Sequence, residues 1–110
     1  MVLQKKNFMK PDETQSPPYS KIETIKIGNV TASKITYQPG WQWSKHIKPV
    51  AGTASCQVHH FGFLISGRLH VKLDDGQEMD IEAGDVVEIP SGHDGWVVGK
   101  EPAVFLQFQS

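Results

Sequence analysis

The chain has 110 residues, of which 38% are hydrophobic and 21% are charged. This size and composition predict one globular domain with a single core and no room for a second domain. The formal net charge is −1, which gives no indication of nucleic acid or an anionic membrane as a partner. No apolar run approaches the roughly 18 residues that a membrane-spanning helix needs.

The cysteine content and the composition of the N-terminal residues indicate the cellular compartment of the protein. The chain has one cysteine, Cys56, which excludes an intramolecular disulfide and with it a disulfide-stapled secreted scaffold. The first residues, MVLQKKNFMKPDETQSPP, contain lysines but no apolar segment of the kind found in secretory signals. We therefore expect a cytoplasmic protein.

Residues 1–20 contain Pro11, Pro17 and Pro18 among polar residues, which disfavours both a helix and a central strand. We predict an extended N-terminal arm over 1–20 and a folded domain over 21–110. In that domain, short segments of alternating or β-type composition predict strands at 21–27, 30–38, 41–46, 57–66, 68–73, 77–82, 86–90, 96–99 and 103–110. The stretch 47–56 is small and polar, and we expect a loop there.

The spacing of the predicted strands indicates the fold class. Apolar residues nowhere hold a period of 3.6 for three turns, so no substantial helix is expected. Glycines recur between the strands about every eight to twelve residues, which is typical of an antiparallel sandwich or barrel. Asp74-Asp75-Gly76 predicts a tight hairpin turn. Because closure removes exposed sheet edges, we predict an all-β fold with a single antiparallel β-barrel.

Two sequence motifs resemble those of the cupin superfamily. Residues 84–92 read GDVVEIPSG, and His60 is followed after six residues by Gly67 and an amphipathic strand. The stretch from Pro39 to Pro102 is similar to small single-domain cupins. The resemblance implies a jelly-roll-like double-stranded β-helix, whose conserved framework says more about the fold than about the chemistry.

The resemblance also implies where a metal site would lie. Most metal-binding cupins show His-x-His and then Glu in the first motif, and a further His after the second. Counting back from His60, which stands at the Glu position, Ala54 and Cys56 occupy the His-x-His positions. The last position falls on Gly95, with a histidine two residues earlier at His93. The usual ligand set is therefore not retained as such.

A second alignment remains open, because His46 lies six residues after Gly40, where the first ligand would fall if 47–56 were an insertion. The candidate ligands are thus His60, His93, Cys56 and His46. Imidazole and thiolate suit a divalent transition metal such as Zn, Fe, Mn, Ni or Cu. The alternative is a buried, hydrogen-bonded histidine and a cysteine that acts as a small hydrophobe.

The remaining histidines and Asp94 have expected roles of their own. Asp94 is expected to bond the second nitrogen of His93, as carboxylates beside metal ligands do, and the alternative is that His93-Asp94 only caps a turn. His59 is expected to face away from His60, and His70 to lie on a polar outer face. Trp43, Trp96 and Leu64 are predicted to line a pocket for a small organic molecule.

Two functions are compatible with these residues. The first is a metal-binding barrel that takes a small organic ligand and acts as a metal-dependent enzyme of unspecified reaction. The second is a metal-free module for small-molecule binding, sensing or structure. For either function we expect a homodimer, paired through outward apolar residues such as Phe61 and Phe63.

Overall fold

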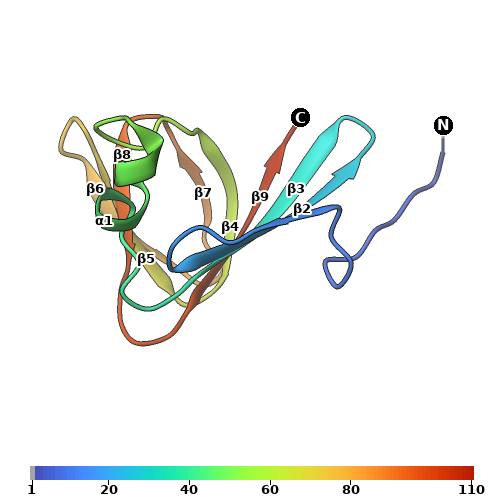
Figure 1. Cartoon of the computed structure of the whole chain (residues 1–110), viewed down its shortest axis with the longest axis horizontal. Helices are drawn as coiled ribbons and strands as arrows, with labels where there is room; N and C mark the ends of the chain where they lie inside the picture. Colours follow the sequence, from blue (N-terminus) through green and yellow to red (C-terminus); the bar gives the residue numbers. More distant parts are fainter. Residues whose placement is uncertain (1) are drawn as a thin grey trace.

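The computed structural model describes residues 2–110 as two antiparallel sheets and two single-turn helices (Figure 1). The larger sheet has the order β1-β2-β3-β9-β4-β7, with β1 Glu13–Gln15, β2 Ser20–Ile27, β3 Val30–Tyr37, β9 Ala103–Gln109, β4 His60–Ser66 and β7 Val86–Ile89. The smaller sheet has the order β6-β5-β8, with β6 Glu78–Glu82, β5 Arg68–Leu73 and β8 His93–Val97. All named strand pairs are antiparallel.

The core lies between the two sheets. Alternate residues of each strand point inward, so Leu64 and Phe105 of the larger sheet meet Leu69 and Ile81 of the smaller one in one buried cluster. The all-β fold predicted from the alternation is therefore confirmed. The strands pair as two separate sheets that enclose this core, and the hairpin turn at Asp74-Asp75-Gly76 joins β5 to β6.

The segment predicted as a strand at 41–46 is instead mostly helical, and that prediction was wrong. It contains α1, Trp43–His46, which is followed in the predicted loop by α2, Lys48–Ala51. The Ser44 amide donates a hydrogen bond to the Asp94 carboxylate at 3.0 Å, a contact across 50 residues that holds the first turn. Gly52 ends α2 with a φ of 76°, a left-handed conformation that favours glycine. No helix in residues 2–110 is long and apolar enough to cross a membrane.

The N-terminal segment adds a short edge strand to the larger sheet. β1 pairs with β2, with Glu13 opposite Thr24, and Asp12 just before it accepts a hydrogen bond from the Lys26 amide at 2.8 Å. The first of the described residues extend away from the sheets (Figure 1). This position agrees with the expectation that the prolines of the segment keep it from a central strand. The division into an arm over 1–20 and a domain over 21–110 stays a prediction.

Gly62 in β4 allows an unusually close approach between two central strands. A Cβ at this position would overlap the Leu106 carbonyl oxygen and lie 2.8 Å from the Cα of Gln107. Since the register pairs Gly62 with Gln107, the close approach brings the inward side chains at this end of β4 and β9 together. This packing positions one wall of the site described next.

Candidate metal centre

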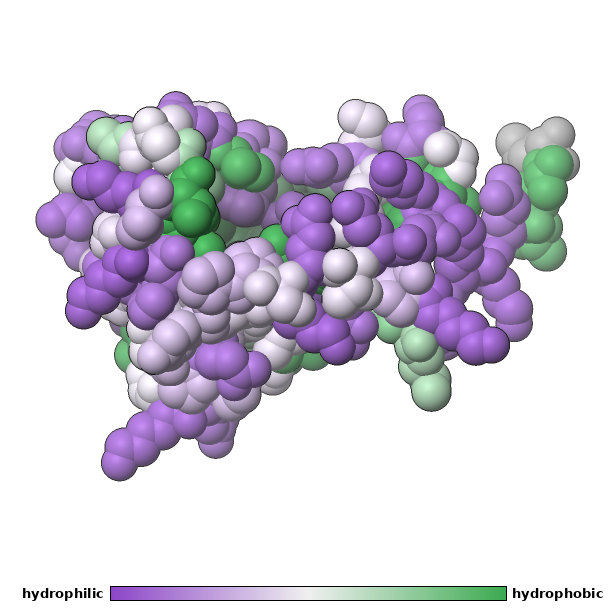
Figure 2. Space-filling model, in the orientation of Figure 1, coloured by the Kyte–Doolittle hydropathy of each residue, from purple (hydrophilic) through white to green (hydrophobic). Residues whose placement is uncertain are grey.

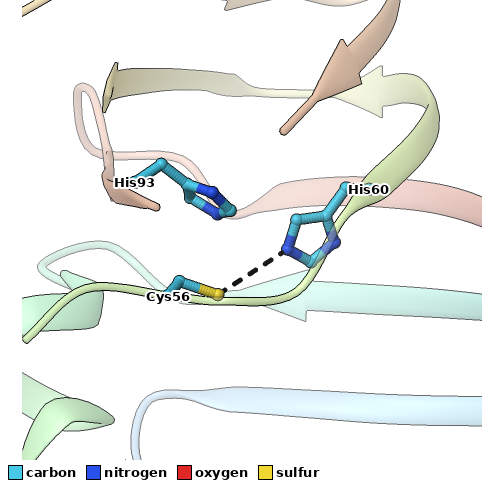
Figure 3. A group of neighbouring side chains, drawn as sticks. All are labelled: Cys56, His60 and His93. Atoms are coloured by element: carbon cyan, nitrogen blue, oxygen red, sulfur yellow. Dashed lines mark hydrogen bonds between the residues drawn. The ribbon is translucent and has the colours of Figure 1, made fainter. Parts of the chain in front are cut away.

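Three side chains meet at one end of the core. Cys56, His60 and His93 each offer one ligand atom, and these atoms all lie within 4.8 Å of one another. Figure 3 shows the two imidazole rings pointing toward each other and toward the cysteine sulfur. Cys56 and His93 are buried, and His60 is half-buried.

Backbone hydrogen bonds hold Cys56 beside His93. The Cys56 amide donates to the His93 carbonyl at 2.7 Å, and the Cys56 carbonyl accepts from the amides of Gly92 and His93 at 2.7 and 3.2 Å. This isolated bridge joins the segment before β4 to the start of β8. The sulfur is therefore brought to His93 by main-chain geometry, which a change of the cysteine side chain would leave in place.

His60 is oriented by Gln107 of β9. The His60 Nδ1 lies 2.6 Å from the Gln107 Oε1, and because an amide oxygen only accepts, Nδ1 carries the proton. The lone pair is then on Nε2, which lies 3.9 Å from the Cys56 sulfur. A hydrogen bond of this kind fixes both the tautomer and the ring orientation of a metal-ligating histidine.

His93 is held in the same tautomer by a different partner. Its Nδ1 donates to the Pro90 carbonyl oxygen at 2.8 Å, which leaves the Nε2 lone pair free. The expectation that Asp94 would take this role was wrong. Asp94 instead accepts hydrogen bonds from the Ser44 amide and the Gln42 side chain, because its side chain turns toward α1.

Burial keeps all three groups uncharged. It lowers the pKa of His60 and of His93, against the opposing effect of their hydrogen bonds to Gln107 and Pro90. It also raises the pKa of the Cys56 thiol, with a small opposing effect from the Val58 amide. The group therefore presents two imidazole lone pairs and one thiol, and a cation could displace the thiol proton.

The structure does not bring His46 to this group. His46 lies at the end of α1, stacks on Tyr19 with the ring centroids 4.2 Å apart, and accepts a hydrogen bond from the Gln42 amide at Nδ1. The alignment through Cys56 is therefore the one that places a donor beside His60 and His93.

The other two histidines lie outside the group. His59 is exposed and pairs with Glu88 at 3.0 Å, as expected for a residue facing away from His60. His70 was expected to be solvent exposed, but its side chain is only 19% exposed because acidic neighbours and Trp96 cover it.

An apolar cavity of about 350 Å³ adjoins the three ligand atoms. Of the three predicted pocket residues, Trp43 lines it. Trp96 stacks on His70 with the ring centroids 4.6 Å apart, and Leu64 is fully buried in the core; neither is among the lining residues. The cavity wall instead includes Tyr37 and Trp41 from the end of β3 and the turn after it.

Gln107 is the functional candidate that the sequence reasoning missed. It is a buried polar residue at 8% exposure, in the same inward alternation as Ala103 and Phe105. An uncharged polar residue at an inward position of a strand needs a hydrogen-bond partner, and that signal was readable from the sequence. Its partner, His60, was not readable, because it lies 47 residues away.

The fold and this group of donors define a small all-β protein with a candidate His/Cys metal site inside it. The family model described as Cupin domain matches residues 34–108. The chain therefore belongs to the cupin family. No curated protein matches it.

Solved structures share the fold at low identity. A protein of unknown function from Rhizobium leguminosarum is 20% identical with a TM-score of 0.69, over 98% of this chain and 96% of that one. KdgF from Halomonas sp. is 17% identical with a TM-score of 0.61, over 87% and 84%. Oxalate decarboxylase from Lactobacillus farciminis is 19% identical with a TM-score of 0.64, over 87% of this chain but only 30% of that one.

Proposed function

We propose that this cupin binds one divalent transition metal ion through the Cys56 sulfur and the Nε2 atoms of His60 and His93. The observation that supports it is the orientation of the donors. Two separate hydrogen bonds, to Gln107 and Pro90, turn both Nε2 lone pairs to the interior where Cys56 lies. Two buried histidines with a purely structural role could satisfy their hydrogen bonds in either tautomer, and their Nε2 lone pairs would not need to face Cys56.

The separations fit such an ion. Zinc bonds of about 2.0–2.3 Å in a tetrahedral arrangement place ligand atoms roughly 3.3–3.8 Å apart. The sulfur and the His60 Nε2 lie 3.9 Å apart, and the whole set lies within 4.8 Å. Side-chain adjustments of less than an ångström would therefore close the site.

The donor set favours particular metals. A thiolate is a soft ligand that suits zinc, iron and monovalent copper, whereas manganese prefers oxygen ligands. Because the proposed ion is divalent, we propose zinc or ferrous iron. Three protein ligands leave a position open toward the cavity, as in catalytic sites. When bound there, the metal would polarise a ligand oxygen or lower the pKa of a water molecule.

The proposal does not extend to oxalate, although oxalate decarboxylase is among the proteins with this fold. Oxalate is a dianion, and the cavity-lining residues within 2–110 include no Lys or Arg to pair with it. A small organic molecule of another kind is proposed below.

The expected homodimer stays a prediction. Of the two residues expected at its interface, Phe61 is 49% exposed and Phe63 is half-buried.

The test is zinc uptake by the full chain, purified without a metal-affinity column. We expect one equivalent of zinc, and a loss of affinity of at least about 100-fold in each of Cys56→Ala, His60→Ala and His93→Ala, more than is typical for loss of an outer partner. The matched controls are His59→Ala and His70→Ala, which should bind as the unchanged protein does.

Two results would contradict the proposal. The first is less than roughly a tenth of an equivalent after titration with zinc and with ferrous iron. The second is unchanged affinity in all three interior variants. Either result would favour the alternative, a metal-free small-molecule-binding, sensor or structural module.

A further inference from the structure

We propose that the cavity beside Cys56, His60 and His93 binds an apolar, mainly aromatic molecule that presents one oxygen donor and carries no second charge. The part that concerns the metal rests on the function proposed above. The part that concerns the ligand's ring and charge rests on the cavity alone. Three observations carry it: the size and lining of the cavity, its charge, and the Tyr37 hydroxyl.

The cavity is apolar and small. Its wall is formed mainly by aliphatic and aromatic side chains from β2, β3, β9 and the segment around α1, among them Ile22, Ile35, Trp43 and Phe105. A dry apolar cavity of about 150 Å³ accepts benzene. At about 350 Å³, this cavity has room for a molecule of about two rings.

The opening lies between the N-terminal segment and the helices. Pro17 on one side and Val50 on the other belong to the cavity wall, and Tyr19 stacks on His46 across the same gap. Figure 2 shows hydrophobic residues within a recess of an otherwise largely hydrophilic face, between the parts that carry α1 and β2. A molecule entering here would pass from an apolar mouth to the three donors.

The charge of the site limits the charge of the ligand. A divalent ion with one thiolate and two neutral imidazoles carries a net charge of +1, which a single anionic oxygen would neutralise. None of the described residues that line the cavity is Lys, Arg, Asp or Glu, and both ring nitrogens of His70, which is also in the lining, are already bonded to Asp80 and Glu78. A second negative charge would therefore be buried without a partner, and that is costly in an apolar environment.

Tyr37 supplies a hydrogen-bond donor to the ligand. Its ring lies in the cavity wall and packs on Trp41 with the centroids 4.2 Å apart. Burial raises the pKa of Tyr37, so its hydroxyl is protonated at neutral pH and can donate a hydrogen bond. A second donor lies beside it, because the buried Nε1 of Trp41 has no hydrogen-bond partner within residues 2–110 and Trp41 also lines the cavity. An acceptor oxygen of the ligand would satisfy such a donor.

The experiment is calorimetric titration of the full chain with two probes of similar size. One is 2-naphthol, which is apolar, neutral and has one oxygen donor; the other is phthalate, which is a dianion. Each is titrated into the metal-free and the zinc-loaded protein. We expect 2-naphthol to bind at least about tenfold more tightly than phthalate in both forms, and zinc to tighten the binding of 2-naphthol further.

Variants test the location and the role of Tyr37. Ile22→Trp should fill the cavity and abolish 2-naphthol binding, whereas Ile27→Trp in the same strand lies outside the wall and should not. Tyr37→Phe should weaken 2-naphthol about fivefold. Zinc affinity should be unchanged in all three variants, which also shows that they are folded.

The outcomes separate the two proposals. Phthalate binding as tightly as 2-naphthol, or 2-naphthol binding unaffected by Ile22→Trp, overturns this inference whether or not zinc is taken up. Failure of zinc uptake overturns the proposed metal centre. The titrations of the metal-free protein with 2-naphthol and phthalate still test whether the cavity binds the neutral aromatic molecule more tightly than the dianion. If zinc binds but does not increase the affinity for 2-naphthol, the proposed contact between the ligand oxygen and the metal is wrong.

Discussion

Two groups of side chains around histidine differ in their surroundings, one in the interior of this protein and one near solvent. The interior group is Cys56, His60 and His93. The outer group is His70, Glu78 and Asp80, in which the two ring nitrogens of His70 donate to the two carboxylates at 2.7 Å each. In the interior group each imidazole donates from one nitrogen only and keeps a lone pair on the other.

The pKa shifts of the two groups have opposite directions. Burial lowers the pKa of both interior histidines, whereas the hydrogen bond to Asp80 and, after it, the one to Glu78 raise the pKa of His70. The same residue type thus offers a lone pair in one place and a proton in the other. What differs is the partner: a carbonyl oxygen in an apolar surrounding, or a carboxylate near solvent.

The largest expected effect concerns the pH dependence of metal affinity. Because burial holds the Cys56 thiol protonated and the interior histidines neutral, metal binding should release one proton. Zinc affinity should then rise about tenfold per pH unit, or about 100-fold from roughly pH 6.5 to 8.5. Competition with a chromophoric chelator measures it. Cys56→Ala is the control and should bind weakly, with little dependence on pH in this range.

A pH-independent zinc affinity in the unchanged protein would contradict the assignment of Cys56 as a ligand. The histidines alone cannot produce the slope, because their lowered pKa values leave them already neutral above about pH 6.5.

The next effect concerns Gln107, which positions His60. Gln107→Leu removes the acceptor for the Nδ1 proton, and zinc affinity should fall about tenfold, the lower end of what such outer partners contribute. Gln107→Glu keeps an acceptor oxygen and should restore most of the affinity. Gln109→Leu, an exposed change in the same strand, is the matched control. Equal affinity in Gln107→Leu and the unchanged protein would show that Gln107 has only a structural role.

The smallest effect concerns the outer group and stability. A raised pKa in the folded state means that His70 contributes stability below its unfolded pKa, near pH 6.5, and loses that contribution as the pH rises through the folded value. His70→Gln should therefore destabilise the metal-free protein more at about pH 5.5 than at about pH 9, by less than about 1 kcal/mol because the carboxylates are exposed. Urea unfolding at the two pH values measures the difference, and a larger loss at the higher pH would contradict it.

The stability of the unchanged, metal-free protein should also depend on pH through the interior histidines. The lowered pKa values of His60 and His93 mean that their contribution is present above the unfolded pKa and is lost as the pH falls through the folded values. The two groups thus act in opposite directions over the acid range. His70→Gln separates them, because it removes only the outer contribution.

Much of the fold was readable in the sequence because strand alternation and turn glycines are local signals. The strands β4, β5, β6, β7 and β9 lie close to the predicted ranges. The prediction of a strand at 96–99 was wrong, because β8 runs from His93 to Val97 and pairs with β5 over residues expected to form a turn. The same local signals failed at 41–46, where tryptophans at alternate positions suggest a strand. There α1 depends on the Asp94 carboxylate, 50 residues away, which no local pattern reveals.

The cupin framework and a short set of candidate ligands were readable from the sequence, because both follow from residue types at fixed spacings. The position of Cys56 rather than His46 beside His93 was not readable there, since it depends on a backbone bridge between distant segments. The tertiary structure also identified Gln107 and Pro90 as the partners that orient the two imidazoles. The tautomer of each imidazole and the direction of its lone pair depend on its hydrogen-bond partner, and these partners come together only when the chain folds.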